Sequence, residues 1–290
     1  MTRRLWLVAI CTGVTLSAQT DSQPLPRMAA TERAFAAATA EIGVRDGFLT
    51  FFADDAIKIV AGRTGAETTV QKAKDGLRAS GEPLLPLRSR LIWAPFTGQV
   101  SSDGSLGWLT GGFANVSNIN EVSRDVLGAG AYFSVWKHQP DGTWKVWLDE
   151  GISLPQTWKD AAPFRAAPDP DAGADGSATE TMAEAEQSIA TGGAAWRGRA
   201  AVAMRLHRDG VMPIDSRDAA IAWASAAWRT VHFSVIKAEV AASGDLGIAI
   251  GGYDAARLDG APEHGTFVRV WRRDSAGHWR VVFETSSANR

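Results

Sequence analysis

The sequence predicts an α+β protein that contains two copies of one domain, each with helices packed on one face of a curved, mostly antiparallel sheet. Three observations support this prediction. A block of residues recurs 140 positions later, helical patterns precede strand patterns in both halves, and a segment rich in Pro, Ala and Asp separates the halves. Helices followed by a run of antiparallel strands is the order typical of an α+β fold.

Two aligned blocks make up the repeat. Residues 100–113 align with residues 240–253 and share the pattern Leu-Gly-x-x-x-Gly-Gly. Residues 132–149 align with residues 267–284 and share two tryptophans on either side of a predicted turn. The offset falls from 140 to 135, so the first copy carries five extra residues between the blocks. Self-similarity of this kind indicates an internal duplication.

The first copy is predicted to open with a helix over residues 31–42, in which Thr31 caps the N-terminus and Glu32 complements the helix dipole. A long strand later in this copy is expected to bend at Pro95. Gly104 and Gly142 each follow an aspartate and predict hairpin turns, because glycine adopts positive φ without a steric penalty. The other predicted elements are helices over residues 44–52 and 67–79 and strands over residues 56–60 and 86–99.

The second copy repeats this order of elements. Helices are predicted over residues 180–190 and 194–206, followed by a turn and a short strand over residues 211–214. Asp215 or Ser216 is expected to cap a third helix, and strands are predicted from residue 230 to the end. That third helix is predicted over residues 217–227.

The N-terminus has the three regions of a bacterial signal peptide. Arg3 and Arg4 precede an apolar run over residues 5–16, and Ser17-Ala18 follows as a small-residue cleavage site. A membrane anchor is the alternative, but about a dozen apolar residues are too few to span roughly 30 Å of hydrocarbon. We therefore expect export, with removal of residues 1–18. Cys11 is the single cysteine, so the mature chain would lack disulfides, which suits a bacterial periplasm.

The predicted organisation of the chain is a signal peptide over residues 1–18, a first domain over residues 27–155, a linker over residues 156–178 and a second domain over residues 179–290. Removing the two N-terminal arginines leaves 28 basic and 32 acidic residues, with no block of Lys and Arg. This charge pattern argues against nucleic acid and anionic membranes as partners. No other segment is apolar enough to cross a membrane.

The order of elements and motifs resembles the nuclear-transport-factor-2-like superfamily. The resemblance lies in two helices, in Phe-Phe-Ala-Asp-Asp-Ala leading into a strand, and in the two hairpin blocks described above. It is nearest to the bacterial SnoaL-like and uncharacterised branches. The resemblance implies a cone-shaped domain whose half-open sheet wraps on helices, a pocket in the cone, and frequent pairing of domains through their sheets. The fold hosts isomerases, dehydratases, cyclases and binding modules, so it does not fix a function.

Two aspartates of the first copy are candidate catalytic carboxylates. Asp55 lies where isomerase-like members of the family place such a group, although Asp54 and Asp55 also suit a structural turn. Asp149 and Glu284 occupy matched positions in the last strands. Each is expected to share a strand face with the basic residue four positions back, Lys145 or Arg280, and to form a solvated salt bridge if that face points outward. Each acid would then lie beside a cation, buried if the face lines the cone.

Unmatched aromatic residues are predicted to distinguish the interiors of the two copies. Trp93 and Trp108 of the first copy become Phe233 and Ile248 in the second, and Ile92 becomes His232, which either projects into the second cone or is a structural histidine. The residues predicted to line a ligand pocket are Trp93, Trp108, Tyr132, His232, Arg269 and Glu284. Histidines and acids do not cluster at metal-ligand spacing, and no nucleotide-binding motif occurs, so neither a metal nor a cofactor is expected.

Three functions remain open from the sequence. The first is binding of a small apolar molecule or a partner in a cone. The second is an isomerase, dehydratase or cyclase activity that uses a pocket carboxylate without a cofactor. The third is a structural pseudo-dimer in which the two domains pair through their sheets. An open cone with a converging carboxylate would favour binding or catalysis, whereas a cone filled by Trp93 and Trp108 would favour the structural role.

Overall fold

The computed structural model describes residues 23–61, 67–83, 87–117, 125–156, 163–173, 175–191 and 195–289. The predicted signal peptide over residues 1–18, with Cys11, lies outside these ranges, as do parts of the predicted linker. No helix within the described ranges is both long enough and apolar enough to cross a membrane.

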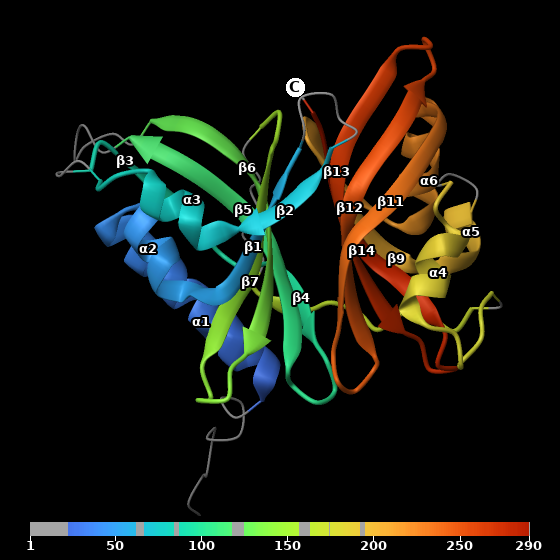
Figure 1. The fold of residues 1–290 in the computed structure, drawn as a ribbon, viewed down its shortest axis with the longest axis horizontal. Helices are drawn as coiled ribbons and strands as arrows, with labels where there is room; N and C mark the ends of the chain where they lie inside the picture. The colour runs from blue at the N-terminus through green and yellow to red at the C-terminus, as the bar shows by residue number, and fades with distance from the viewer. Residues whose placement is uncertain are drawn as a thin grey trace, which may run out of the picture.

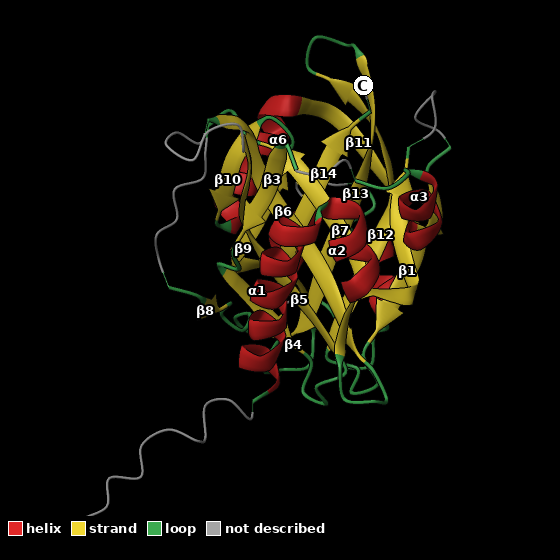
Figure 2. Ribbon diagram, turned by 90° about the vertical axis from the view of Figure 1, so that its left-hand side faces the viewer, coloured by secondary structure: helices red, strands yellow, loops and turns green. Residues whose placement is uncertain are grey.

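The first unit packs its helices on one face of an eight-stranded sheet (Figures 1 and 2). The sheet order is β2-β1-β7-β6-β5-β4-β8, with β3 also paired to β5; only the β1–β7 and β4–β8 pairs are parallel. Its elements are α1 (Pro24–Ile42), α2 (Val44–Phe51), β1 (Phe52–Val60), β2 (Thr69–Lys72), α3 (Ala73–Ala79), β3 (Ser89–Trp93), β4 (Thr97–Val100), β5 (Leu106–Ser117), β6 (Val126–His138), β7 (Trp144–Ser153) and β8 (Arg165–Ala166).

The second unit has a six-stranded sheet in the order β10-β9-β14-β13-β12-β11, in which only the β9–β14 pair is parallel. The central strands therefore follow the same order in both units, with β1-β7-β6-β5 corresponding to β9-β14-β13-β12. Its elements are α4 (Met182–Ser188), α5 (Trp196–Arg199), β9 (Ala200–Arg208), β10 (Val211–Asp215), α6 (Arg217–Ala227), β11 (Trp228–Val240), β12 (Leu246–Arg257), β13 (Pro262–Arg273) and β14 (Trp279–Ala288). The predicted α+β class, with two curved, mostly antiparallel sheets that pack on helices, is confirmed.

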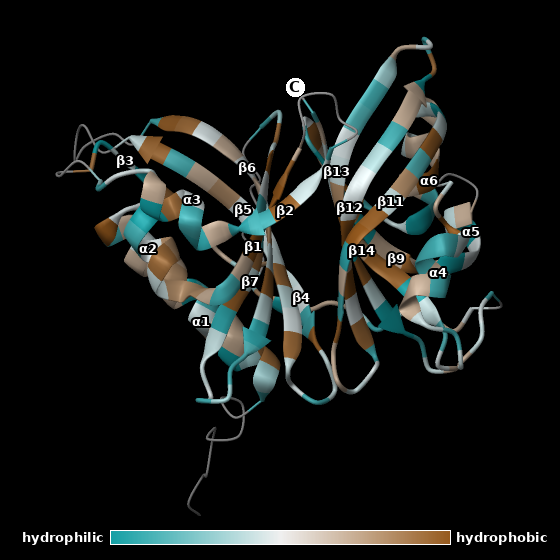
Figure 3. Ribbon diagram, viewed as in Figure 1, coloured by the Kyte–Doolittle hydropathy of each residue, from teal (hydrophilic) through white to brown (hydrophobic). Residues whose placement is uncertain are grey.

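The two sheets face each other and the helices lie on the outer sides (Figure 1). Apolar side chains of both units form one cluster between the sheets, and apolar residues run along these facing strands in Figure 3. At its centre the rings of Phe133 and Phe283 stack 4.6 Å apart, and Trp108 lies 5.2 Å from Phe283. Burial of large aromatic side chains on both sheets makes this contact resemble a protein core.

Two hairpin turns join the units at one end of this contact. Asp245 accepts hydrogen bonds from the backbone amide of Ser102, at 3.0 and 3.3 Å, and Asp103 accepts one from the amide of Ser243 at 3.0 Å. Each turn therefore supplies an aspartate to the other. Gly104 and Gly142 have positive φ, at 72° and 83°, which confirms the predicted hairpin turns.

Three predicted helices differ from the structure. α1 begins at Pro24 rather than at residue 31, so Thr31 is not its cap, and its hydroxyl donates to the Arg27 carbonyl. Residues 69–72 form β2, so only residues 73–79 of the predicted helix over 67–79 are helical. Residues 200–206 belong to β9, because pairing with β14 on one side and β10 on the other outweighs the helix preference of alanine.

The predicted strand over residues 86–99 is also divided. β3 ends at Trp93 and β4 begins at Thr97, and Pro95 lies in the gap between them. Proline lacks the amide hydrogen that a strand ladder requires, so the chain breaks here instead of bending within one strand. The helix over residues 217–227 is confirmed, and Ser216 is its cap through a 3.4 Å contact with the Ala219 amide.

Candidate functional site

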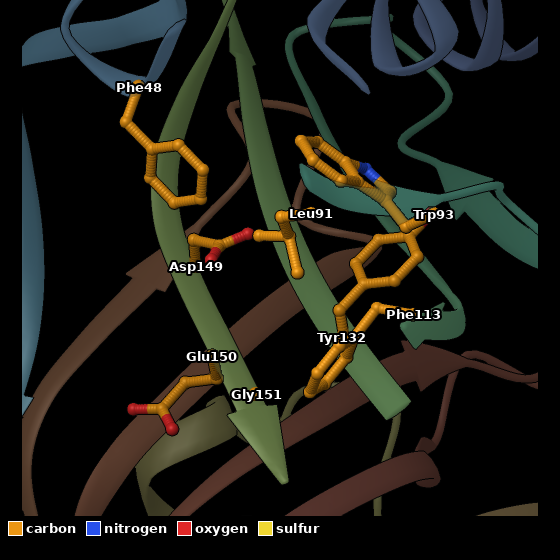
Figure 4. Close-up of a pocket in the computed structure, with 8 residues that line it drawn as sticks. All are labelled: Phe48, Leu91, Trp93, Phe113, Tyr132, Asp149, Glu150 and Gly151. Carbon is orange, nitrogen blue, oxygen red and sulfur yellow. The ribbon is translucent and has the colours of Figure 1, made fainter. Parts of the chain in front are cut away.

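A cavity of about 120 Å³ lies inside the first unit, between its helices and its sheet. It is lined mostly by apolar and aromatic side chains, and Figure 4 shows the Asp149 carboxyl projecting among them. The lining residues come from α2, β3, β5, β6 and β7: Phe48, Leu91, Trp93, Phe113, Tyr132, Asp149, Glu150 and Gly151. The volume suits a group about the size of a benzene ring.

Asp149 has no hydrogen-bond or ion-pair partner for its carboxyl among the described residues. Burial raises the pKa of Asp149 well above its ordinary value, and the nearby carboxyls of Glu32 and Glu150 raise it further. Burial also raises the pKa of Glu150 to about 7, although its side chain points away from that of Asp149 in Figure 4. Asp149 is therefore the acid that faces the cavity.

Glu32 of α1 lies fully buried behind the wall of this cavity. Its Oε1 accepts a hydrogen bond from Trp93 Nε1 at 2.6 Å. Its Oε2 accepts bonds from Ser134 Oγ at 2.6 Å and from Trp136 Nε1 at 2.9 Å. Burial raises the pKa of Glu32, and these three donors oppose the shift. The carboxyl thus fixes the Trp93 ring that forms part of the cavity wall.

Tyr132 contributes a second polar group that lacks a partner. The side chain is 5% exposed, and its hydroxyl is buried without a hydrogen-bond partner among the described residues. Burial raises the pKa of Tyr132 well above its ordinary value, as do the negative charges of Glu32 and Asp149, while Arg33 opposes them. Buried polar groups in native proteins are usually satisfied, so an unpartnered hydroxyl beside a cavity indicates a place for a ligand.

The equivalent region of the second unit is filled by an arginine. Arg269 lies between Glu186 of α4 and Glu284 of β14, and all three are buried. Its Nε and Nη2 lie 2.7 Å from Glu284 Oε2, and its Nη1 donates to Glu186. Trp271 also donates to Glu186, as Trp136 does to Glu32. Burial alone would lower the pKa of Arg269, but the two carboxylates raise it.

Matched register places these residues at equivalent positions. Ser134 pairs with Asp149 across β6 and β7, and Arg269 pairs with Glu284 across β13 and β14. The sequence offset between the two pairs is the same, 135 residues. At this position the first unit has Ser134 beside an acid without a partner among the described residues. The second unit has Arg269, which forms ion pairs with two acids.

A β-bulge explains why the predicted partners of Asp149 and Glu284 are wrong. The register shifts after Val146 in the first unit and after Val281 in the second, which adds one residue and reverses the alternation of faces. Lys145 instead donates to the backbone carbonyl of Thr50 at 2.9 Å. Arg280 pairs with Asp274 at 2.9 Å. Neither cation shares a strand face with the acid four positions later.

The other predicted site residues divide between cavity and framework. Trp93 and Tyr132 line the cavity. Trp108 does not, because its ring packs between the sheets against Phe133 and Phe283. His232 is exposed and does not lie in the second core, but it lines a separate hollow of the second unit together with Glu186 and Phe233. Asp55 is exposed on β1, 3.5 Å from Lys137, and does not reach the cavity.

Sequence reasoning missed the two buried helix acids. Glu32 was assigned to the helix dipole, yet it shares one helix face with buried Phe35, Ala36 and Thr39. The spacing of these four residues, at i, i+3, i+4 and i+7, was the signal that Glu32 points inward. Glu186 of α4 likewise lies next to buried Ala185. Among the described residues, no group of three or more His, Cys, Asp or Glu side chains could hold a metal ion.

No family model matches the sequence, and no curated protein matches it. Solved structures that resemble parts of the chain include a candidate calcium/calmodulin dependent protein kinase II association domain from Xanthomonas campestris, at 15% identity over 49% of this chain and 95% of that one, with a TM-score of 0.36. A nuclear-transport-factor-2-like protein of unknown function from Prochlorococcus marinus is 16% identical over 39% and 94%, with a TM-score of 0.33. A ketosteroid isomerase-like protein from Erwinia carotovora is 14% identical over 33% and 80%, with a TM-score of 0.29. At these identities and TM-scores the likenesses carry no information about activity, ligand or partner.

Proposed function

We propose that the first unit binds a small, largely apolar molecule and that the cavity beside Asp149 receives one end of it. The observation that supports this proposal is a carboxyl without a partner, set among apolar and aromatic walls in a preformed cavity. Ligand sites are typically apolar hollows with a few converging polar groups. The cavity accommodates a ring-sized group, so the remainder of a larger ligand would extend toward solvent.

In this proposal the chain is an exported bacterial protein with two copies of one domain. The predicted signal peptide over residues 1–18 supports export, and the equal order of central strands and the matched bulges support duplication. The domains would extend over residues 27–155 and 179–290 and pair through their sheets, with residues 156–178 as the linker. The second domain, whose equivalent region holds Arg269 and its two acids, would then serve as a scaffold for the first.

Native mass spectrometry of the purified full chain, together with a thermal-shift screen of small aromatic compounds, tests binding. A bound molecule should also change the fluorescence of Trp93, which forms part of the wall. Leu91→Trp fills the cavity from β3 and should abolish binding and stabilisation. Ile92→Trp, on the exposed side of the same strand, is the matched control and should leave both unchanged. Equal binding by the Leu91 and Ile92 variants would place the ligand outside the cavity.

Acid–base catalysis is a second candidate, favoured by the raised pKa of Asp149 in an apolar cavity. A carboxyl whose pKa is raised keeps its proton to higher pH and is therefore better suited to donate it to a bound substrate. Any isomerase, dehydratase or cyclase activity found with this protein should fall by at least about 100-fold in Asp149→Asn, the usual contribution of a general acid or base. Turnover that survives this substitution would end the catalytic assignment of Asp149.

A further inference from the structure

The second unit shows what kind of group fits between these walls. The Arg269 guanidinium carbon lies 4.6 Å from the ring centroid of Phe233 and 4.7 Å from that of Phe267. The aligned residues of the first unit are Trp93 and Tyr132, at offsets of 140 and 135, and both line the cavity. The acid on the remaining side, Glu284, is aligned with Asp149. The two rings that contact a guanidinium in the second unit therefore correspond to two residues that line the cavity in the first.

We propose that the cavity of the first unit binds a planar cationic group of its ligand, an amidinium or a guanidinium, against Asp149 and beside the Trp93 and Tyr132 rings, which lie edge to face 6.4 Å apart. This inference rests on the proposed function, because it names the chemical class of the group that the cavity receives. Ser134 stands at the position equivalent to Arg269 and carries a short side chain that reaches Glu32 and Trp136. A ligand would then supply from outside the charge that the second unit carries in its own sequence.

The polar groups at the cavity complement such a cation. A bound cation favours the ionised form of Asp149, whose carboxylate only accepts hydrogen bonds, and the unpartnered Tyr132 hydroxyl is able to accept one. Amidinium and guanidinium groups carry several N–H donors in one plane and no acceptor, and they stack on aromatic faces. The same planar geometry pairs with a carboxylate through two parallel bonds. An ammonium ion would use only part of this arrangement.

The charges around the cavity also favour a cation. Glu32 of α1 and Glu150 of β7 are the charged groups that act on Asp149, and both are acids. The side chains that α2 and β3 present to the cavity are apolar or aromatic: Phe48, Leu91 and Trp93. These three carboxyls, when ionised, attract a cation and repel an anion, and Arg33, which acts on Tyr132, is the basic group that opposes them.

Calorimetric titration with benzamidine, benzamide and benzoate tests the proposal, because these compounds share one ring and differ in charge. Benzamidine should bind about 10-fold more tightly than benzamide, the difference between a charge-assisted and a neutral hydrogen bond, and benzoate should not bind. Asp149→Asn should remove the preference. Asp55→Asn is the matched control, because it deletes the same charge at an exposed position of the same sheet and should keep the preference.

Ser134→Arg gives an independent test, since it places in β6 the residue that β13 carries. The variant should fold, as measured by circular dichroism, and lose benzamidine binding. Unchanged benzamidine binding in Ser134→Arg would overturn the equivalence of the two sites. Equal affinity of wild-type protein for benzamidine and benzamide would overturn the cation assignment while the apolar site stands. Loss of all binding, including the aromatic compounds of the thermal-shift screen, would overturn the proposed function itself.

Discussion

Replacing Arg269 with methionine should strongly destabilise the second unit. Arg269 and Glu284 are fully buried and Glu186 is 4% exposed, so the substitution leaves two acids in the core without their cation. Removing one partner of a buried ion pair costs about 3–5 kcal/mol. For a unit of this size that cost corresponds to a fall in melting temperature of roughly 10–20 °C.

The loss of stability in Arg269→Met should grow as pH rises. Without Arg269, burial holds the pKa of Glu284 in the folded state above its value of about 4.5 in the unfolded state. The folded variant then binds more protons than the unfolded chain above pH 4.5, so its stability falls as pH rises through this window. The deficit relative to wild type should therefore be smaller at pH 5 than at pH 7.5, and Arg269→Met combined with Glu284→Gln should recover part of it.

Differential scanning calorimetry at both pH values measures this effect and separates the two units if they unfold in different steps. Arg257→Met is the matched control, because Arg257 is 53% exposed and its ion pairs with Asp259 and Glu263 lie at 3.7 and 3.5 Å. Exposed pairs contribute about 0–1 kcal/mol. Suppose that Arg269→Met lowers the free energy of unfolding by no more than Arg257→Met does, and equally at both pH values. This result would refute the conclusion that Arg269 and its two acids form a buried ion-paired cluster.

Three further predictions concern the contact between the sheets and the acids of β7. Phe283→Ala should lower the free energy of unfolding in urea by about 3–5 kcal/mol, because it removes a ring that stacks on Phe133 and packs against Trp108; a decrease below about 1 kcal/mol would contradict the packing. Glu150→Gln should stabilise the protein above pH 7 by at most about 3 kcal/mol. The pKa of Glu150 is about 7 in the folded state against 4.5 in the unfolded state, so the wild-type protein loses stability as pH rises from 4.5 to 7. A difference in unfolding free energy between variant and wild type that is the same at pH 5 and at pH 8 would contradict this prediction. Benzamidine affinity should rise as pH rises above 3.8, the ordinary pKa of an aspartate, because burial raises the pKa of Asp149 and a bound cation favours its ionised form; a flat calorimetric profile would contradict proton release on binding.

The sequence alone determined the class of the fold and much of its framework. The alternating strands, the positive-φ glycines at 104 and 142 and the paired tryptophans depend on local rules, and these rules operate within a few residues. Two walls of the cavity, Trp93 and Tyr132, and its acid, Asp149, were also among the residues singled out from the sequence. They emerged because two aligned halves can be compared residue by residue.

Only the tertiary structure decided which side chains meet. The bulges in β7 and β14 reverse the strand alternation, so Asp149 and Glu284 do not face the cations that simple periodicity assigns to them. Residues 200–206 pair as a strand because of neighbours far away in the chain. Glu32 lies inward because Trp93, Ser134 and Trp136, between 61 and 104 residues later, supply its hydrogen bonds. A buried charge is tolerated only where such distant partners converge, and no local pattern encodes that convergence.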